Sequence, residues 1–263
     1  MTTTIDLDDL RSHIGRTQTA TDVVLPGPAN LLRLALGRPE PEYREGDVLP
    51  PAWLALYFLP RVAADGLRPD GSPRDTGVVP PLALQGLAVI SVKHGNTGTL
   101  VFATVTSRVH GPGGLAIEEE RRTVFREEVK AGDRNQAPRR EPPPTDAPWR
   151  RTVTPDPVLL FRYSALTFNS HRIHYDRAWA MEVEGYPGLV VHGPLTTTLL
   201  IDFARDQNPD RRIVAYSTQA RAPLFDTAPF ELRGRSATTG RGAELWAVTP
   251  EGTIAMSAEV ELA

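Results

Sequence analysis

Three side chains within six residues could carry out acid–base chemistry: Asn169, His171 and His174. Histidine exchanges protons near neutral pH more readily than any other side chain. An Asn amide can orient a water molecule but cannot take its proton, so the role of general base falls to His174. The spacing therefore predicts a site at which His174 activates a water that Asn169 orients.

Two other interpretations of this cluster stay open. In the first, Asn169 and the histidines only satisfy backbone groups of a hydrogen-bonded turn. In the second, His171 and His174 bind a metal ion with Asp176 as a third ligand. Metal sites draw ligands from several segments and no other cluster of such residues stands out, so we expect no metal.

A second motif spans Val190–Leu195. In it, two valines are followed by His192-Gly193-Pro194. The Gly-Pro pair predicts the start of a helix. Pro194 has no N–H, so the unpaired donors there belong to Gly193 and to Leu195 onward. These donors can stabilise a carbonyl oxygen that gains negative charge. Alternatively, Gly193 only allows close packing of a buried helix; His192 is predicted to be structural in either case.

Two arginines are candidates for holding an anionic group of a substrate. Arg172 lies between the histidines, and Arg221 lies further along the chain. A guanidinium can bind a carboxylate or phosphate, but a solvent-facing charge is an equally good interpretation of each. The chain has no G-x-S-x-G motif, which disfavours a serine esterase.

The second half of the chain must position these residues, and its pattern predicts an α+β fold. An alternating stretch, Val158–Thr167, predicts a strand leading into the histidines. Asp176 is the expected N-cap of a helix over Arg177–Glu184. Apolar residues at four-residue spacing predict a longer helix over Pro194–Arg205. The remaining strands are predicted at 189–191, 212–219, 230–237, 243–249 and 253–261, with turn residues between the last four.

The first half gives a fainter version of the same pattern. Five prolines between residues 137 and 148 predict a stiff linker at 136–150, which separates halves at 1–135 and 151–263. Helices are predicted over 10–14, 28–36 and 51–59, and strands over 89–92, 99–107 and 116–126. This half has no Asn/His cluster, so we interpret it as a degenerate partner of the second.

Composition excludes several classes of function. The 263-residue chain has 40% hydrophobic and 23% charged residues, a formal net charge of −3 and no cysteine. We therefore expect no nucleic-acid partner, no disulfide and no thiol nucleophile. The acidic N-terminus is unlike a signal peptide, and no apolar run is long enough to cross a membrane. A cytoplasmic location without membrane association is the expectation.

The two motifs together resemble the MaoC-like hydratases and dehydratases. Phe161–Asp176 and Glu184–Leu195 are similar to the branch with a double hot-dog fold, which includes type 2 3-hydroxyacyl-thioester dehydratases and the mesaconyl-C4-CoA and itaconyl-CoA hydratases. Arg221–Phe225 is similar to the segment that follows in that branch. The resemblance is strong over about 158–230 and weak in the first half.

The resemblance implies an α+β double hot dog, in which each half wraps an antiparallel sheet around one long helix. It also implies reversible addition of water to an α,β-unsaturated acyl thioester, without cofactor or metal. R-specific members have an Asp five residues before the catalytic His; Asn169 stands there in this chain, so His171 is a candidate for the missing proton transfer. Relative to the family, the first half is shortened by about two strands.

The resemblance leaves the substrate open. A short C4–C5 dicarboxylic acyl-CoA, of the itaconyl-CoA or mesaconyl-C4-CoA type, is the leading prediction, with Arg172, Arg221 and Leu195 as expected substrate contacts. The alternatives are a fatty 3-hydroxyacyl-thioester dehydratase, a hot-dog acyl-CoA thioesterase and a non-catalytic acyl-CoA-binding subunit. A homodimer is also left open.

Overall fold

The computed structural model describes residues 14–74, 89–95, 98–126 and 141–263. The chain divides into two compact units. Unit 1 contains residues 1–20 and 62–137, and unit 2 contains residues 21–61 and 138–263. All the predicted site residues lie in unit 2.

Unit 2 is built on a five-stranded antiparallel sheet with the order β4-β6-β7-β8-β5. Its strands are β4 (Trp149–Val153), β5 (Ile213–Ala220), β6 (Phe230–Ser236), β7 (Gly242–Val248) and β8 (Ile254–Leu262). Strands β6, β7 and β8 form a meander, and β5 pairs with the far edge of β8. The strands predicted at 212–219, 230–237, 243–249 and 253–261 are confirmed; β4 was not predicted.

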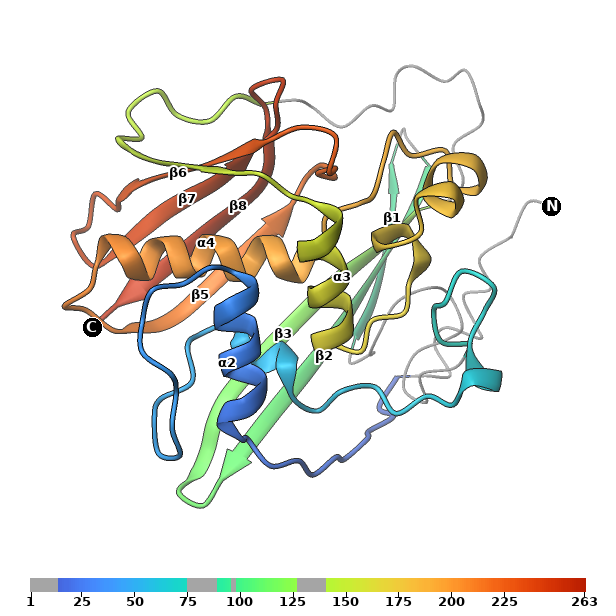
Figure 1. Cartoon of the computed structure of the whole chain (residues 1–263), viewed down its shortest axis with the longest axis horizontal. Coiled ribbons are helices and arrows are strands. Elements are labelled where there is room, and N and C mark those ends of the chain that lie inside the picture. Colours follow the sequence, from blue (N-terminus) through green and yellow to red (C-terminus); the bar gives the residue numbers. More distant parts are fainter. Residues whose placement is uncertain (1–13, 75–88, 96–97, 127–140) are drawn as a thin grey trace. The chain divides into compact units, whose positions relative to one another are not determined.

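The long helix α4 (Gly193–Gln207) packs against this sheet and forms the core with it (Figure 1). Leu195 and Phe203 are fully buried in that core, whereas Leu199 is partly buried. Strands β6, β7 and β8 contribute alternating or nearly continuous buried positions to the same core. The predicted helix and its apolar stripe are thus confirmed, and Pro194 lies in its first turn as expected.

Residues 21–61 pack against α4 although they are far from it in sequence. They contain α2 (Pro26–Ala35) and the short η1 (Trp53–Leu56). The indole Nε1 of Trp53 donates to the buried Asp202 carboxylate, and Arg38 forms ion pairs with Asp202 and Asp206. Burial raises the pKa of Asp202 to about 6, against the opposing effect of Arg205 and Arg38.

The described part of unit 1 contains a three-stranded antiparallel sheet, β1-β2-β3, and the single turn η2 (Ala64–Gly66). The strands are β1 (Val89–Gly95), β2 (Gly98–Gly111) and β3 (Gly114–Arg126). Strands β2 and β3 form a hairpin whose turn has Gly114 at a φ of 103°. The three predicted strands are confirmed, and the predicted helix at 10–14 lies outside the described residues.

The strand predicted over Val158–Thr167 is wrong, because this stretch is the helix α3 (Pro157–Leu166). Asp156 caps it by accepting a hydrogen bond from the Leu159 N–H, and Pro157 occupies its first turn. Its buried residues follow a helical period: Leu160, Tyr163 and Ser164. Phe161, whose two-residue spacing from Tyr163 suggested a strand, is exposed, and so is Phe168 just after the helix.

Two further predictions need correction. The helix expected over 51–59 is only the single 3-10 turn η1, and Ala52 before it is left-handed. The predicted short strand at 189–191 is a single bridge between Val190 and Phe225. The linker at 136–150 stays a prediction; within its described part, Ala147 is buried beside Trp246 of β7.

The helix predicted over 28–36 is confirmed as α2. The compact units differ from a division into 1–135 and 151–263, because residues 21–61 join unit 2 through the contacts just described. That the two halves are hot-dog repeats, and that the first is shortened, stays a prediction, since residues 75–88 lie outside the described part. Among the described helices, none has the length and hydrophobicity needed to span a membrane.

Candidate active site

The segment that carries the histidines leaves α3 through a tight turn. Phe168 is left-handed, with a φ of 50°, and the Asn169 N–H donates to the Ser164 carbonyl at 2.8 Å. The Asn169 side-chain oxygen accepts a hydrogen bond from the His171 N–H at 3.0 Å. Part of the turn interpretation is therefore correct, because Asn169 shapes the loop; its amide NH₂ keeps its donors for another partner.

His174 is buried in the short η4 (Arg172–His174) and has one ring nitrogen engaged. Its Nδ1 lies 2.7 Å from the Val190 carbonyl oxygen. A carbonyl can only accept, so Nδ1 carries the proton and Nε2 carries a lone pair. The Val190 N–H in turn donates to the Ile173 carbonyl at 3.0 Å. This pair of bonds fixes the tautomer that a general base needs.

The protonation state of His174 is set by burial. Desolvation lowers its pKa to about 4, against the raising effect of the Val190 carbonyl and with a smaller contribution from His171. His174 is thus neutral at physiological pH, and Nε2 is available to accept a proton.

Three imidazoles form one cluster around His174. The His192 ring stacks on it with centroids 3.7 Å apart and planes 19° from parallel. His171 meets it edge-on, at 5.6 Å and 87°. The His192 Nε2 and the Ser164 Oγ are also hydrogen-bonded, at 2.8 Å, and the tautomer of His192 decides which of them donates. The structure therefore brings together both predicted histidines and a third one.

The segment before α4, residues 188–192, is fixed by hydrogen bonds to residues 224–226. These bonds set the positions of Val190 and His192. The Asp226 carboxylate accepts from the Leu189 N–H at 2.8 Å, and the Asp226 N–H donates to the Leu189 carbonyl. The Val191 N–H donates to the Leu224 carbonyl at 2.8 Å. Gly188 is needed here, because a Cβ would lie 2.7 Å from the Asp226 Oδ1.

Helix α4 begins at Gly193 with free space around it. Apart from its chain neighbours and the nearby backbone of α4, a Cβ added to Gly193 would meet no atom of the described residues within 4 Å. The close-packing alternative therefore has no support among these residues, and both interpretations of Gly193 remain predictions. The Thr196 N–H donates to the His192 carbonyl, whereas the N–H groups of Gly193 and Leu195 have no acceptor within the helix. No acidic residue stands in the first turn to neutralise its partial positive charge.

The helical segment at 177–183 follows, and its last five residues are the π-helical η5 (Trp179–Val183). Asp176 caps the start of this segment, as predicted. Its Oδ1 accepts from the Trp179 N–H at 3.1 Å, and its Oδ2 accepts from Arg172 at 2.6 Å. The Trp179 N–H and Arg172 lower the pKa of Asp176. Since these contacts occupy Asp176 and Val190 occupies the His174 Nδ1, the three-ligand set of His171, His174 and Asp176 has no support here.

Arg172 stays close to the histidines but is engaged. Its guanidinium stacks over the Trp179 ring at 4.0 Å and forms the ion pair with Asp176. Arg221 lies just beyond β5, where it pairs with Glu141 and Gln219; none of its described contacts is with the histidines. The Leu195 side chain is fully buried in the core, so only its backbone N–H is left to face a substrate.

Two groups at the site were missed or undervalued by sequence reasoning: Ser164 and the Val190 carbonyl. Ser164 was assigned to a strand, so its place on the buried face of α3 could not be foreseen. Val190 belongs to the apolar run before His192, but nothing in its residue type indicates a carbonyl that fixes a tautomer.

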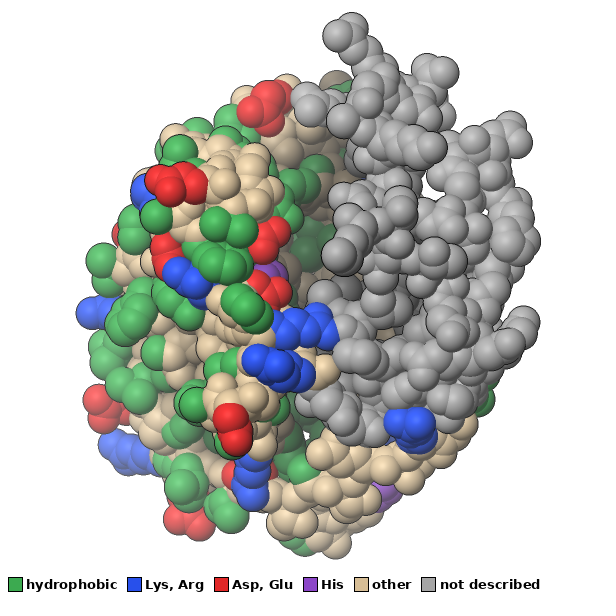
Figure 2. All heavy atoms as spheres, turned by 90° about the vertical axis from the view of Figure 1, so that its right-hand side faces the viewer, with side chains coloured by type: hydrophobic (Ala, Val, Ile, Leu, Met, Phe, Trp, Pro, Cys, Tyr) green, Lys and Arg blue, Asp and Glu red, His purple; other side chains and the backbone are tan. Residues whose placement is uncertain are grey.

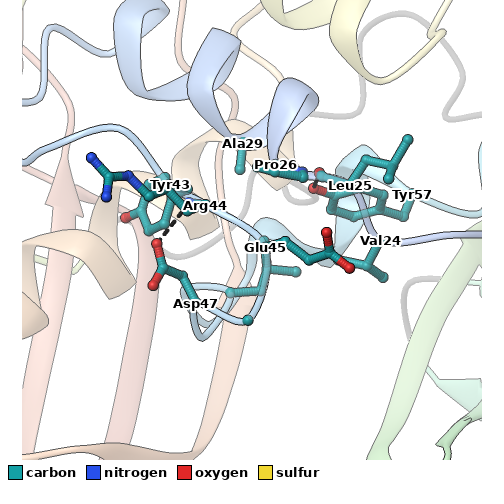
Figure 3. A pocket seen from close by; sticks show the side chains of 11 residues that line it. Val24, Leu25, Pro26, Ala29, Tyr43, Arg44, Glu45, Asp47 and Tyr57 are labelled. Carbon is teal, nitrogen blue, oxygen red and sulfur yellow. Dashed lines mark hydrogen bonds between the residues drawn. The ribbon is translucent and has the colours of Figure 1, made fainter.

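The small pocket in Figure 3 lies elsewhere in unit 2. It is lined by α2 and by the loops around Tyr43 and Tyr57, and Asp47 accepts a hydrogen bond from the Arg44 N–H at its edge. Its volume of about 40 Å³ holds only a few water molecules. A larger hollow, of about 500 Å³, is lined by Arg38, Glu40, Arg205 and Asp206.

That larger hollow lies toward the end of α4 opposite to the histidines, and its arginines are already paired with the carboxylates around them. Neither of these two cavities is lined by a residue of the histidine cluster. Figure 2 shows acidic and basic side chains interspersed with hydrophobic ones on the described part of the face that it views.

Comparison with known proteins identifies the family. The family model for hydroxyacyl-thioester dehydratase type 2 matches residues 87–226, more than half of the chain. A mesaconyl-C4-CoA hydratase from Chloroflexus aurantiacus is 40% identical over 280 residues, covering 97% of this chain and 98% of that protein. The mitochondrial hydroxyacyl-thioester dehydratase type 2 of Schizosaccharomyces pombe is 36% identical over 81 residues, covering 30% of this chain and 27% of that protein.

Among solved structures, HtdX from Mycobacterium tuberculosis is similar over 90% of this chain and 97% of its own, with a TM-score of 0.55 and 19% identity. This likeness and the antiparallel sheet packed on α4 confirm the predicted α+β hot-dog fold. The family match and the similarity to the Chloroflexus hydratase lead to one conclusion: the chain belongs to the MaoC-like hydratase and dehydratase family, in its hydroxyacyl-thioester dehydratase type 2 branch.

Proposed function

We propose that this protein is a hydro-lyase that reversibly adds water to an α,β-unsaturated acyl-CoA thioester, with His174 as its general base. The observation that carries the proposal is the state of His174. The ring is neutral, its tautomer is fixed by the Val190 carbonyl, and it lies next to the residue that opens α4. The family and its hydratase relative support the same reaction.

The first step requires a base and a positioned water. His174 Nε2 takes a proton from the water while the water oxygen forms a bond to the β-carbon. The electron pair of the double bond moves toward the thioester, and an enolate-like species results. Asn169 retains its amide donors after bonding to His171, which supports a role in orienting the water.

The second step returns the proton. The imidazolium of His174 gives its Nε2 proton to the α-carbon, so the elements of water are added and the base is regenerated. Until then the negative charge rests on the thioester oxygen. The unpaired N–H groups at the start of α4 and the open space at Gly193 support stabilisation of that oxygen. We propose syn addition, with His171 as a further proton carrier.

For the acyl group, we propose a C4–C5 dicarboxylic chain of the mesaconyl-C4-CoA or itaconyl-CoA type. The support is the similarity along nearly the whole chain to a mesaconyl-C4-CoA hydratase. Arg172 is two residues from His174 in the sequence, and its side chain is 35% exposed, which supports it as a contact for a free carboxylate. The second candidate is a fatty 3-hydroxyacyl thioester, favoured by the family match.

We further propose that the enzyme uses no cofactor or metal and acts on a small acyl-CoA in the cytoplasm, either as a monomer or as a homodimer. Activity that is unchanged after exhaustive dialysis against EDTA would support the first part. Sedimentation of the purified protein distinguishes the two assembly states.

The test is incubation of the purified protein with mesaconyl-C4-CoA, itaconyl-CoA and crotonyl-CoA, following product mass and free thiol. A gain of one water on a dicarboxylic thioester, lost in His174→Ala, supports both the reaction and the substrate class. Hydration of crotonyl-CoA alone keeps the reaction and moves the substrate to fatty acyl chains.

Two outcomes would overturn the proposal. Release of free thiol would indicate a thioesterase, for which Asp176 is poorly suited because it is already paired with Arg172 and the Trp179 N–H. Tight binding of an acyl-CoA without any turnover would indicate a non-catalytic subunit.

A further inference from the structure

His192 is fully buried, yet one of its polar atoms is left without a partner. The Nδ1 atom has no hydrogen bond among the described residues, while Nε2 bonds to Ser164. Burying an unsatisfied polar atom destabilises a protein, and an apolar side chain would fill the same space without that cost. Packing alone therefore does not explain why a histidine stands here.

The contacts of His192 restrain its ring from three directions. Ser164 of α3 forms a hydrogen bond with the His192 Nε2. The Tyr163 ring meets the His192 ring edge-on, with centroids 4.9 Å apart, and the His174 ring stacks on it. Because His192 is also the N-cap of α4, its backbone cannot shift without moving the helix. The ring thus offers His174 a fixed flat surface.

Burial keeps the His192 ring neutral. If its Nε2–H donates to the Ser164 Oγ, the unpartnered Nδ1 carries a lone pair and no proton. Desolvation and the neighbouring His174 and His171 lower the pKa of His192 to about 2. A neutral His192 adds no positive charge that would oppose protonation of His174.

We propose that His192, held by Ser164, is a positioning residue that fixes the plane of the His174 ring and the direction of its Nε2 lone pair. This inference rests on the proposed function for its kinetic consequences, but not for its structural ones. Ser164 takes part twice, because its carbonyl also accepts from the Asn169 N–H. One residue of α3 thereby links the water-orienting Asn169 to the base.

Four variants test the role: Ser164→Ala, Ser164→Thr, His192→Ala and His192→Phe. We expect Ser164→Ala to lower kcat about tenfold with KM within twofold, and Ser164→Thr to restore most of the rate. His192→Ala should lower kcat about a hundredfold, and His192→Phe, which keeps a stacked ring, should recover part of it. The acidic limb of kcat/KM should move in the variants that loosen the ring.

The matched control is Thr167→Val, which removes a hydroxyl from the end of α3 that bonds only to the Tyr163 carbonyl. It should match Ser164→Ala in thermal stability and keep the wild-type rate. If Ser164→Ala behaves like Thr167→Val in kcat and in the acidic limb, the positioning role is wrong while the hydratase proposal stands. Because this comparison uses only Ser164→Ala and Thr167→Val, it still tests the positioning role if His192→Ala does not fold.

A readout without substrate separates the two proposals. Nitrogen-15 line widths of the His174 imidazole should indicate a ring held in one orientation in the wild type and exchange between orientations in Ser164→Ala. If no acyl-CoA is turned over but the line widths change in this way, the positioning role is supported and the proposed reaction fails. Unchanged His174 line widths in both Ser164→Ala and His192→Ala would overturn the inference.

Discussion

The central residue is a histidine that the fold keeps uncharged. His174 is desolvated by its position in η4 and by the stacked His192, and its one donor is committed to Val190. The usual cost of a buried imidazole is reduced because this tautomer satisfies Nδ1. The other ring nitrogen, Nε2, has a lone pair that can accept a proton at neutral pH. A base that activates water requires this property.

The pH dependence of the reaction should reflect that environment. Since burial lowers the pKa of His174 to about 4, the base stays unprotonated down to mildly acidic pH. We expect kcat/KM to be flat between pH 5 and 7 and to fall roughly tenfold per unit only below about pH 4. A limb near 6.5, the ordinary value for histidine, would contradict this account of the site.

Gly193 allows a direct test of the start of α4. Because an added Cβ meets no atom of the described residues beyond its chain neighbours and the nearby backbone of α4, Gly193→Ala should fold normally, with a free energy of unfolding within about 1 kcal/mol of the wild type. The methyl group would occupy the space through which a thioester oxygen approaches, so kcat/KM should fall about tenfold or more. Wild-type kinetics in this variant would exclude Gly193 from the substrate site.

The matched change is Gly188→Ala, five residues earlier. A Cβ there lies 2.7 Å from both the Asp226 Oδ1 and the Thr227 Cγ2, so we expect about 1–3 kcal/mol of destabilisation from overpacking. Chemical denaturation of both variants measures the difference; equal stabilities would show that the segment before α4 is not held as described.

At the scale of elements, the sequence predicted the helix α4 and the strands β5–β8 well, because their periods and turn residues are clear. It failed at α3, where Phe161 and Tyr163 are spaced as on one face of a strand while the buried residues are Leu160, Tyr163 and Ser164. The Asp156-Pro157 pair was the available signal for a helix start.

The candidate site was predicted unevenly for the same reason. Asn169, His174 and Gly193 are close in sequence to recognisable helix starts and turns, so their motifs could be read directly. The contact between Ser164 and His192 joins α3 to α4 across 28 residues, and no local pattern encodes such a contact. The pairing of Arg221 with Glu141, 80 residues away, was beyond prediction for the same reason.

Residues 21–61 are attached to the end of α4 by buried charges, and this gives a prediction for that attachment. The Arg38 side chain is only 10% exposed and pairs with Glu40, Asp202 and Asp206. Arg38→Ala leaves buried carboxylates uncompensated and should cost about 3 kcal/mol. The control is Arg108→Ala, which breaks an exposed pair with Glu118 and should cost less than about 1 kcal/mol.

Thermal unfolding of Arg38→Ala and Arg108→Ala measures the loss of stability in each variant. In limited proteolysis, residues 21–61 should be cleaved earlier in Arg38→Ala than in the wild type. If both arginines prove equally dispensable, the buried network does not hold this segment.

At the scale of the whole molecule, buried histidines should make the fold sensitive to acid. The folded-state pKa values of His174 and His192 are lowered below the ordinary value of 6.5, so the unfolded chain binds more protons. Their stabilising contribution is complete above pH 6.5 and is lost as the pH falls, by about 1.4 kcal/mol per unit for each group.

His192→Phe removes one of these groups. Its free energy of unfolding should therefore fall less steeply than that of the wild type between pH 6.5 and 4.5, as measured by urea denaturation. Parallel pH profiles would mean that folding does not lower the pKa of His192.

The most direct test of the central claim, that His174 adds water across an acyl-CoA double bond, is the reaction in ¹⁸O-labelled water followed by mass spectrometry. The account predicts one ¹⁸O in the intact thioester, at the β-hydroxyl, formed by the wild type and reduced at least a hundredfold in His174→Ala. Label in a released free acid, or equal incorporation by His174→Ala, would contradict it.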